Sequence, residues 1–261
     1  MEPMIGSRHR LPPSDREPVR VGAVSPLTIS EWPGRVCAII FCQGCAWRCR
    51  YCDKPELVSV REPARLGWQR TLAMLEARRR VANNVVLGGG EPLVQRNLFS
   101  AVMQLRERDF QVGLHTAGIF PERLEKVLPW LQWVALDIKA LEEDYLATTR
   151  VSGSGRKAMA SLERMLASAV PSECRTTVHW QLMDEDRLIR LADRLAAMGV
   201  RDYAIQLART RGNLDPGLEN RPAPVNTEAL WKEIGARFRR FTVRETTRPA
   251  SREVNQGFAV P

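Results

Sequence analysis

Short apolar runs alternate along this chain with longer stretches in which apolar residues recur at helical spacing. The runs are nearly continuous in apolar residues, as in residues 36–41 (VCAIIF), which is typical of strands buried on both faces. The stretches between them predict helices. We expect strands at residues 36–42, 84–87, 110–115, 133–138, 174–180 and 203–207, with a short strand at 241–244, and helices at residues 68–80, 93–108, 121–131, 142–149, 157–169, 184–198 and 227–238.

This order of elements predicts an α/β fold with a parallel sheet, because strands joined by helical crossovers pair in parallel with right-handed connections. The pattern leaves open whether the sheet stays open or curves into a barrel. In both cases, functional groups gather in the loops at the carboxyl ends of the strands. Residues 211–225 are rich in Gly, Pro and Asn, and we expect them to form a long loop over those ends.

The composition is that of a globular chain. Of its 261 residues, 44% are hydrophobic and 26% charged, which is enough apolar material for a sizeable core. It has no run of 18 or more apolar residues, so a membrane span is not expected. Residues 1–20 carry charges and prolines but no apolar segment of a secretory signal. We interpret residues 1–21 as a flexible leader, 22–245 as one domain and 246–261 as a tail, in a cytoplasmic protein.

The formal net charge of +9 suits either nucleic acid or an acidic protein partner. No single basic stripe dominates, and residues 78–80 (RRR) fall at the end of a predicted helix, where cations complement the helix dipole. An ordinary solvated basic surface is therefore favoured, and nucleic-acid binding is not expected.

The cysteines point to metal or redox chemistry, since five of the six fall between positions 37 and 52. Cys45, Cys49 and Cys52 follow the first predicted strand with the spacing C-x3-C-x2-C. Thiolates are soft ligands that favour iron–sulfur clusters or zinc. Three thiolates around a cluster of four irons leave one iron open to bind something else, as an open position does in catalytic zinc sites.

Cys42 makes the ligand count ambiguous. If it is added, four thiolates can close a zinc site or a saturated electron-transfer cluster. At the end of a strand, however, a buried thiol also serves as a small hydrophobic residue. We favour three ligands, with Cys42 and Cys37 structural and Cys174 in the core.

Two further groups stand at predicted strand ends. Residues 88–92 (GGGEP) combine glycines, which let a backbone approach a ligand closely, with Glu91, which can accept hydrogen bonds from an ammonium group. The alternative is an ordinary turn into a helix, where Glu and Pro are favoured. Asp137 and Lys139 end the fourth strand and can contact ribose hydroxyls and a carboxylate; the alternative is a solvated charge pair.

Together these motifs resemble the radical S-adenosylmethionine superfamily. The cysteine spacing, with the aromatic Tyr51 before the last cysteine, is similar to its cluster motif. Residues 89–91 (GGE) resemble its element that holds the methionine amino group, and residues 137–139 (DIK) the D-L-K element of glycyl-radical activases. Residues 115–118 (HTAG) look like its D-T-N-G segment with the acid replaced by His115, which puts any role of that acid, such as cation binding, in doubt.

The resemblance implies a partial (β/α)6 barrel that binds one 4Fe–4S cluster and S-adenosyl-L-methionine. No catalytic residue beyond the cluster ligands is implied. The metal ligands would be Cys45, Cys49 and Cys52, and the residues contacting S-adenosylmethionine would be Tyr51, Gly89, Gly90, Glu91, Asp137 and Lys139.

A narrower resemblance is to activating proteins of anaerobic ribonucleoside-triphosphate reductase. Residues 31–34 (EWPG) are similar to the acidic–aromatic–Pro–Gly step before their first strand, and residues 52–57 (CDKPEL) to their C-H-N-P-E-L, with Asp53 and Lys54 departing from it. Residues 53–87 are too few for the ferredoxin-like insert that some activases carry. The resemblance implies an oxidoreductase that forms a glycyl radical on a partner, anaerobic ribonucleotide reductase, with electrons from a flavodoxin- or ferredoxin-type donor.

Three rival functions stay open from the sequence. The first is a radical S-adenosylmethionine enzyme that acts on a small molecule, similar to 7-carboxy-7-deazaguanine synthase. The second is a four-cysteine electron carrier without catalysis. The third is a zinc-bearing module that binds RNA, which the positive charge permits.

Overall fold

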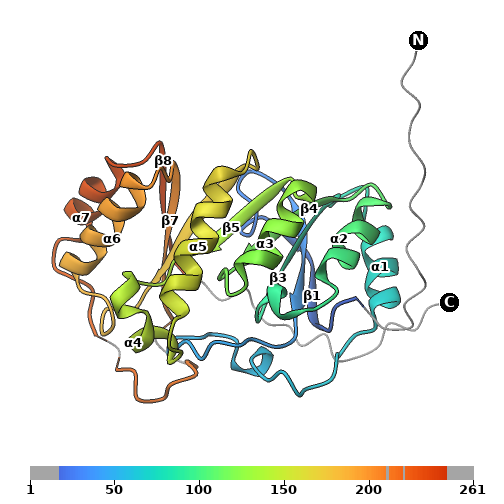
Figure 1. The fold of residues 1–261 in the computed structure, drawn as a ribbon, viewed down its shortest axis with the longest axis horizontal. Coiled ribbons are helices and arrows are strands. Elements are labelled where there is room, and N and C mark those ends of the chain that lie inside the picture. Colours follow the sequence, from blue (N-terminus) through green and yellow to red (C-terminus); the bar gives the residue numbers. More distant parts are fainter. Residues whose placement is uncertain (1–17, 210–211, 220, 246–261) are drawn as a thin grey trace, which may run out of the picture.

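The computed structural model describes residues 18–209, 212–219 and 221–245. These residues form one eight-stranded sheet in which the strands follow their sequence order (Figure 1). The first two strands pair antiparallel, and every later pair is parallel. The strands are β1 (Val21–Thr28), β2 (Cys37–Cys42), β3 (Asn84–Gly89), β4 (Gln111–Thr116), β5 (Trp133–Asp137), β6 (Ser172–Val178), β7 (Asp202–Leu207) and β8 (Arg240–Glu245).

The sheet is an open barrel, because β1 and β8 are its two edges and do not pair with each other. The predicted fold class, a partial (β/α) barrel, is confirmed. Helices connect the parallel strands in order along the sheet (Figure 1). They are α1 (Trp68–Glu76), α2 (Leu98–Arg106), α3 (Pro121–Val127), α4 (Tyr145–Thr149), α5 (Ser154–Ala167), α6 (Glu185–Ala197) and α7 (Thr227–Gly235), with short 3-10 turns η1 (Pro55–Leu57), η2 (Pro92–Val94), η3 (Leu128–Trp130) and η4 (Glu142–Asp144).

Two separate apolar clusters pack on the two faces of the sheet. The larger cluster includes Ile40 of β2 and the buried positions of the helices, so it fills the space between sheet and helices. The smaller one includes Ile39, whose side chain points to the opposite face from that of Ile40. We call it the inner cluster; its buried members are Trp32, Cys37, Ile39, Val86, Trp133 and Ala135.

Two stacked tryptophans form the floor of the inner face. The rings of Trp32 and Trp133 lie 5.4 Å apart and nearly parallel. Trp133 and Cys37 are the first residues of their strands, so the stack lies where the parallel strands begin. Gly113 of β4 makes room for it, because a Cβ there would lie 3.0 Å from the Trp32 ring. The inner face is therefore filled at the strand starts, opposite the ends where functional loops are expected.

Strand β1 was not predicted. It is an edge strand with a proline and mostly half-exposed positions, so it lacks the continuous apolar pattern of the central strands. Residues 1–17 of the predicted leader and residues 246–261 of the predicted tail lie outside the described residues. The last residues of the predicted leader are described, and Val19 and Val21 are buried in the larger apolar cluster, which we call the outer core.

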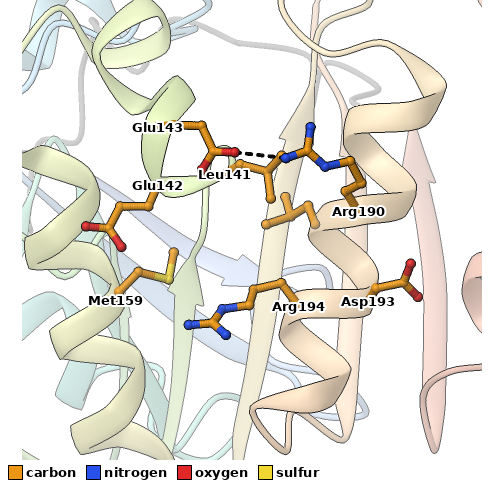
Figure 2. Close-up of a pocket in the computed structure, with 8 residues that line it drawn as sticks. Leu141, Glu142, Glu143, Met159, Arg190, Asp193 and Arg194 are labelled. Carbon is orange, nitrogen blue, oxygen red and sulfur yellow. Dashed lines mark hydrogen bonds and ion pairs between the residues drawn. The ribbon is translucent and has the colours of Figure 1, made fainter.

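A surface pocket lies in the helical layer (Figure 2). Its walls come from the turn after β5 and from α5 and α6, and Glu143 pairs with Arg190 across it at 3.0 Å. None of the predicted site residues lines this pocket. The candidate site is instead at the carboxyl ends of the strands.

Candidate active site

The structure divides the six cysteines into two groups. Cys37, Cys42 and Cys174 are fully buried in the two apolar clusters. The other three lie half-buried on the loop that follows β2, which we call the cysteine loop (residues 43–54). All six are free thiols. The loop cysteines are Cys45, Cys49 and Cys52.

Backbone hydrogen bonds shape the cysteine loop. The N–H groups of Gly44 and Cys45 donate to the carbonyls of Leu57 and Val58 at 2.8 and 3.0 Å. The N–H of Cys52 donates to the carbonyl of Cys49 at 3.0 Å, which makes a tight turn between these two cysteines. The loop therefore holds its shape through the backbone and leaves the sulfur atoms free to take a ligand.

The three loop thiols are protonated at neutral pH in the absence of a metal. Burial, reinforced by the charge of Glu91, raises the pKa of Cys45 to about 12, and burial raises that of Cys49 to about 11. Burial also raises the pKa of Cys52. Lys139 opposes each of these increases. A metal deprotonates a coordinating thiol outright, so these thiols become thiolates only when they bind one.

The glycine turn after β3 packs directly on the cysteine loop. The N–H groups of Gly90 and Glu91 donate to the carbonyls of Cys42 and Gly44 at 3.0 and 2.9 Å. A Cβ at Gly89 would lie 2.4 Å from the Cys42 nitrogen, and one at Gly90 would lie 2.6 Å from the Gly44 oxygen. The absence of Cβ atoms thus lets two backbones meet, whereas the sequence suggested an approach to a ligand.

Glu91 is buried and connects two strand ends. Its carboxylate accepts hydrogen bonds from the N–H groups of Leu93 and Ala117 at 2.9 and 2.7 Å, and from the Thr116 hydroxyl. Burial raises its pKa, and these hydrogen bonds oppose the increase. The first contact caps the short turn η2, which was the alternative role considered from the sequence.

Asp137 and Lys139 form a buried ion pair at the end of β5. The Lys139 Nζ lies 3.2 Å from one Asp137 oxygen, and the other oxygen lies 3.0 Å from the His115 Nε2. Burial opposes both charges, yet Lys139 and His115 hold the pKa of Asp137 well below its usual range, and Asp137 holds that of Lys139 above its own. The pair is therefore charged, and with side chains only 10% and 19% exposed it is not the solvated pair of the alternative.

Tyr51 brings this ion pair next to the cysteine loop. The Lys139 ammonium lies 5.9 Å from the centre of the Tyr51 ring. The Tyr51 hydroxyl is buried and has no hydrogen-bond partner among the described residues. Because an unpartnered buried hydroxyl is destabilising, it marks a position where a bound molecule can supply the missing hydrogen bond.

His115 joins the site to a deeper ionic network inside the barrel. Its Nδ1 lies 3.4 Å from a Glu31 oxygen, and Glu31 in turn lies 3.7 Å from the guanidinium of Arg175. Arg175 is fully buried, pairs with Glu173 at 2.7 Å and stacks over Trp133. It therefore faces the barrel interior and meets carboxylates there.

We expect His115 to make the stability of the fold pH-dependent. Burial opposes its protonation, but the charge of Asp137 and hydrogen bonds to Asp137 and Glu31 raise its pKa. Stability from the imidazolium is therefore complete below about pH 6.5 and is lost as the pH rises through the raised pKa. Denaturant unfolding between pH 6 and 9 should show a smaller loss in His115→Gln than in the native chain.

His179 provides the opposite control. Burial, with the charge of Arg50, lowers its pKa, so the native state gains stability from this residue as the pH rises. Below about pH 6.5, His179→Gln should therefore change the pH slope in the direction opposite to the change that His115→Gln makes above that pH. Equal slopes for the native chain and His115→Gln would contradict the expected imidazolium.

The comparisons with known proteins agree with this arrangement. The profile of the Radical SAM superfamily, where SAM is S-adenosylmethionine, matches residues 39–195, from β2 through most of α6. The chain belongs to this superfamily. Membership implies a 4Fe–4S cluster and S-adenosylmethionine as cofactors.

The residues present fit these two groups. Three half-buried thiols on one loop are suitable iron ligands, and an unpartnered hydroxyl beside a buried ammonium suits a polar ligand. In the described part of the chain, no three His, Cys, Asp or Glu side chains converge on a position for a single metal ion.

Relatives of two kinds match the chain. A protein of Methanocaldococcus jannaschii, provisionally named a glycyl-radical enzyme activating enzyme, is 25% identical over 82% of this chain and 90% of its own length. The pyruvate formate-lyase-activating enzyme of Clostridium pasteurianum is 26% identical over 53% of this chain and 59% of its length. A 7-carboxy-7-deazaguanine synthase of Methanopyrus kandleri is 32% identical over 42% of this chain and 51% of its length.

A solved structure shows the same fold. SuiB of Streptococcus suis, crystallised with its precursor peptide SuiA, superimposes with a TM-score of 0.58 at 13% identity. The match covers 77% of this chain but only 47% of SuiB, so the chain spans about half the length of that protein. Among the described residues, no helix is both long and apolar enough to cross a membrane.

Proposed function

We propose that this chain is a glycyl-radical enzyme activating enzyme. It binds one 4Fe–4S cluster through Cys45, Cys49 and Cys52, cleaves S-adenosylmethionine reductively and generates a glycyl radical on a partner, anaerobic ribonucleoside-triphosphate reductase. The observation that carries the proposal is the separation of three loop thiols from three core thiols, next to the buried Asp137–Lys139 pair. The Methanocaldococcus relative, matched over most of both chains, supports the activase class.

The chemistry that the bound cluster supplies is one-electron reduction of S-adenosylmethionine. The residues of this chain bind and orient that molecule. Lys139 is suited to its carboxylate because the ammonium is buried and charged. Glu91 accepts three hydrogen bonds from protein donors, and an ionised carboxylate has acceptor sites for about four, so one site is left for an ammonium group. Gly89 and Gly90 would present backbone oxygens, Tyr51 its hydroxyl, and Asp137 an acceptor for ribose hydroxyls.

The partners follow from the same proposal. The cluster needs electrons from a flavodoxin- or ferredoxin-type donor, and the net charge of +9 favours acidic partners. The open barrel leaves the carboxyl ends of the strands accessible to a peptide loop that carries the target glycine. We place the reaction in the cytoplasm.

A direct test is reductive cleavage of S-adenosylmethionine under anaerobic conditions. The reconstituted protein, reduced with dithionite, should contain about four irons per chain, as a cubane cluster requires, and release methionine and 5′-deoxyadenosine. Cys49→Ala should do neither. A protein that holds the four irons but leaves S-adenosylmethionine intact would contradict the proposed function and favour an electron carrier.

The second candidate is a radical enzyme that acts on a small molecule, favoured by the match to 7-carboxy-7-deazaguanine synthase. Adding purified anaerobic ribonucleotide reductase separates the two. An activase should produce the EPR doublet of a glycyl radical on the reductase. If 5′-deoxyadenosine forms only with a deazaguanine precursor and no glycyl radical appears, the small-molecule function is correct.

A further inference from the structure

The loop that follows β7 lies against the cysteine loop. The N–H of Leu214 donates to the carbonyl of Cys52 at 3.0 Å, and the N–H of Asp215 donates to that of Arg50 at 2.9 Å. Strands β2 and β7 have four other strands between them in the sheet. These contacts therefore join two distant strand ends across the open end of the barrel.

The Asp215 carboxylate makes this contact ionic. One oxygen lies 2.7 Å from the Arg50 Nε and 2.7 Å from the Arg150 guanidinium, and the other accepts the N–H of Gly217 at 3.0 Å. The side chain of Asp215 is 10% exposed. The hydrogen bonds from Arg50 and Gly217, and then the charge of Arg150, lower its pKa, so it is ionised at neutral pH. Charge-assisted hydrogen bonds of this kind are stronger than neutral ones.

The end of α4 supports the cysteine loop on another side. The N–H groups of Arg48 and Arg50 donate to the carbonyls of Thr149 and Thr148, both at 3.0 Å. Arg150 follows directly in the left-handed conformation, with φ of 57°, and its side chain reaches Asp215. Asp215 thus connects three segments that are distant in the sequence: the cysteine loop, the end of α4 and the loop after β7.

We propose that Asp215 is a positioning residue that holds the Cys49–Cys52 part of the cysteine loop in place before the cluster binds. We call Asp215 with Arg50 and Arg150 the Asp215 clamp. The clamp acts on the cysteine loop at Arg50, between Cys49 and Cys52. The neighbours of the clamp residues, Thr149 and Leu214, hold residues 48 and 52 through backbone hydrogen bonds. A preordered loop binds metal more tightly because less conformational entropy is lost on binding. This inference rests on the proposed function in one respect, the assignment of these cysteines as cluster ligands.

The clamp is tested in the metal-free protein by thiol labelling, resolved by peptide mass spectrometry. In Asp215→Asn, Cys49 and Cys52 should react about tenfold faster than in the native chain, because the loop opens locally once the ionic hydrogen bonds are lost. The three core cysteines serve as internal reporters of global unfolding and should keep their native rates: Cys37, Cys42 and Cys174.

Two variants complete the design. Asp193→Asn is the matched control, since Asp193 also pairs with an arginine, Arg237, but lies in α6 on the outer helical layer (Figure 2), and it should label like the native chain. Asp215→Glu retains the charge and should restore slower labelling. If Asp215→Asn labels at native rates, or if its core cysteines accelerate to the same extent as Cys49 and Cys52, the clamp is refuted.

The reconstituted protein gives a second readout. Iron should be released to a chelator faster from Asp215→Asn than from Asp193→Asn and the native chain. Labelling requires neither a cluster nor S-adenosylmethionine, so the two proposals fail separately. If Asp215→Asn labels faster as expected but the native chain never cleaves S-adenosylmethionine, only the proposed function is overturned. If the native chain is active but labelling is unchanged in Asp215→Asn, only the clamp is overturned.

Discussion

Replacement of Cys42 by Ala should leave a full complement of iron and sulfide, whereas replacement of Cys45, Cys49 or Cys52 by Ala should abolish the cluster and the cleavage of S-adenosylmethionine. Cys42 is fully buried at the end of β2 and packs in the outer core, while the other three lie half-buried on the cysteine loop. The expected cost of Cys42→Ala is that of a small cavity, about 1 kcal/mol of unfolding free energy.

Cys174→Ala is the matched control for that experiment, because Cys174 is equally buried in the same core. Iron and acid-labile sulfide are measured after anaerobic reconstitution, alongside denaturant unfolding of the metal-free proteins. If Cys42→Ala loses its iron while Cys174→Ala keeps it, four thiolates bind the metal, and the site is a closed one.

Asp137→Asn should be the most damaging single change away from the cysteines. The substitution leaves two cations, the buried Lys139 and the partly buried His115, without the carboxylate that faces both. Breaking a buried ion pair on one side destabilises a protein by about 3–5 kcal/mol. We therefore expect a large fall in the denaturant midpoint, and weaker binding of S-adenosylmethionine to the reconstituted protein because Lys139 is no longer held.

A surface pair provides the comparison for Asp137→Asn. Glu143 and Arg190 lie 3.0 Å apart with side chains that are 60% and 63% exposed, so Glu143→Gln should change stability by less than about 1 kcal/mol. Equal, small effects of the two substitutions would show that the Asp137 network is solvated and not a buried support of the site.

Strands β2 and β3 were predictable because each is a nearly continuous apolar run covered on both faces. The bounds of the helices were less predictable from the sequence. The helix predicted at residues 121–131 is divided into α3 and η3, and Pro129 lies in η3. A proline inside a helix removes a backbone hydrogen bond, so the α-helix ends before it. Strand β1 escaped prediction because an edge strand carries no such run.

The candidate site was also predictable only in part. The cysteine spacing, the glycine turn and the Asp137–Lys139 step are local patterns, and the structure brings them together at the strand ends. Asp215 is different: it lies 165 residues from Arg50, and only the fold makes them neighbours. The one local signal was the Asp-Pro-Gly turn in a loop expected to cover the strand ends.

The stacked Trp32 and Trp133 fill the interior of this open barrel at its strand starts and leave the opposite end for the functional loops. Both rings are nearly inaccessible, and together with the inner cluster they fill the inner face at the strand starts. On the proposed function, electrons and the target glycine would therefore both reach the site from the strand ends, where the cysteine loop lies. If donor and partner share this entrance, an excess of the partner enzyme should slow the next reduction.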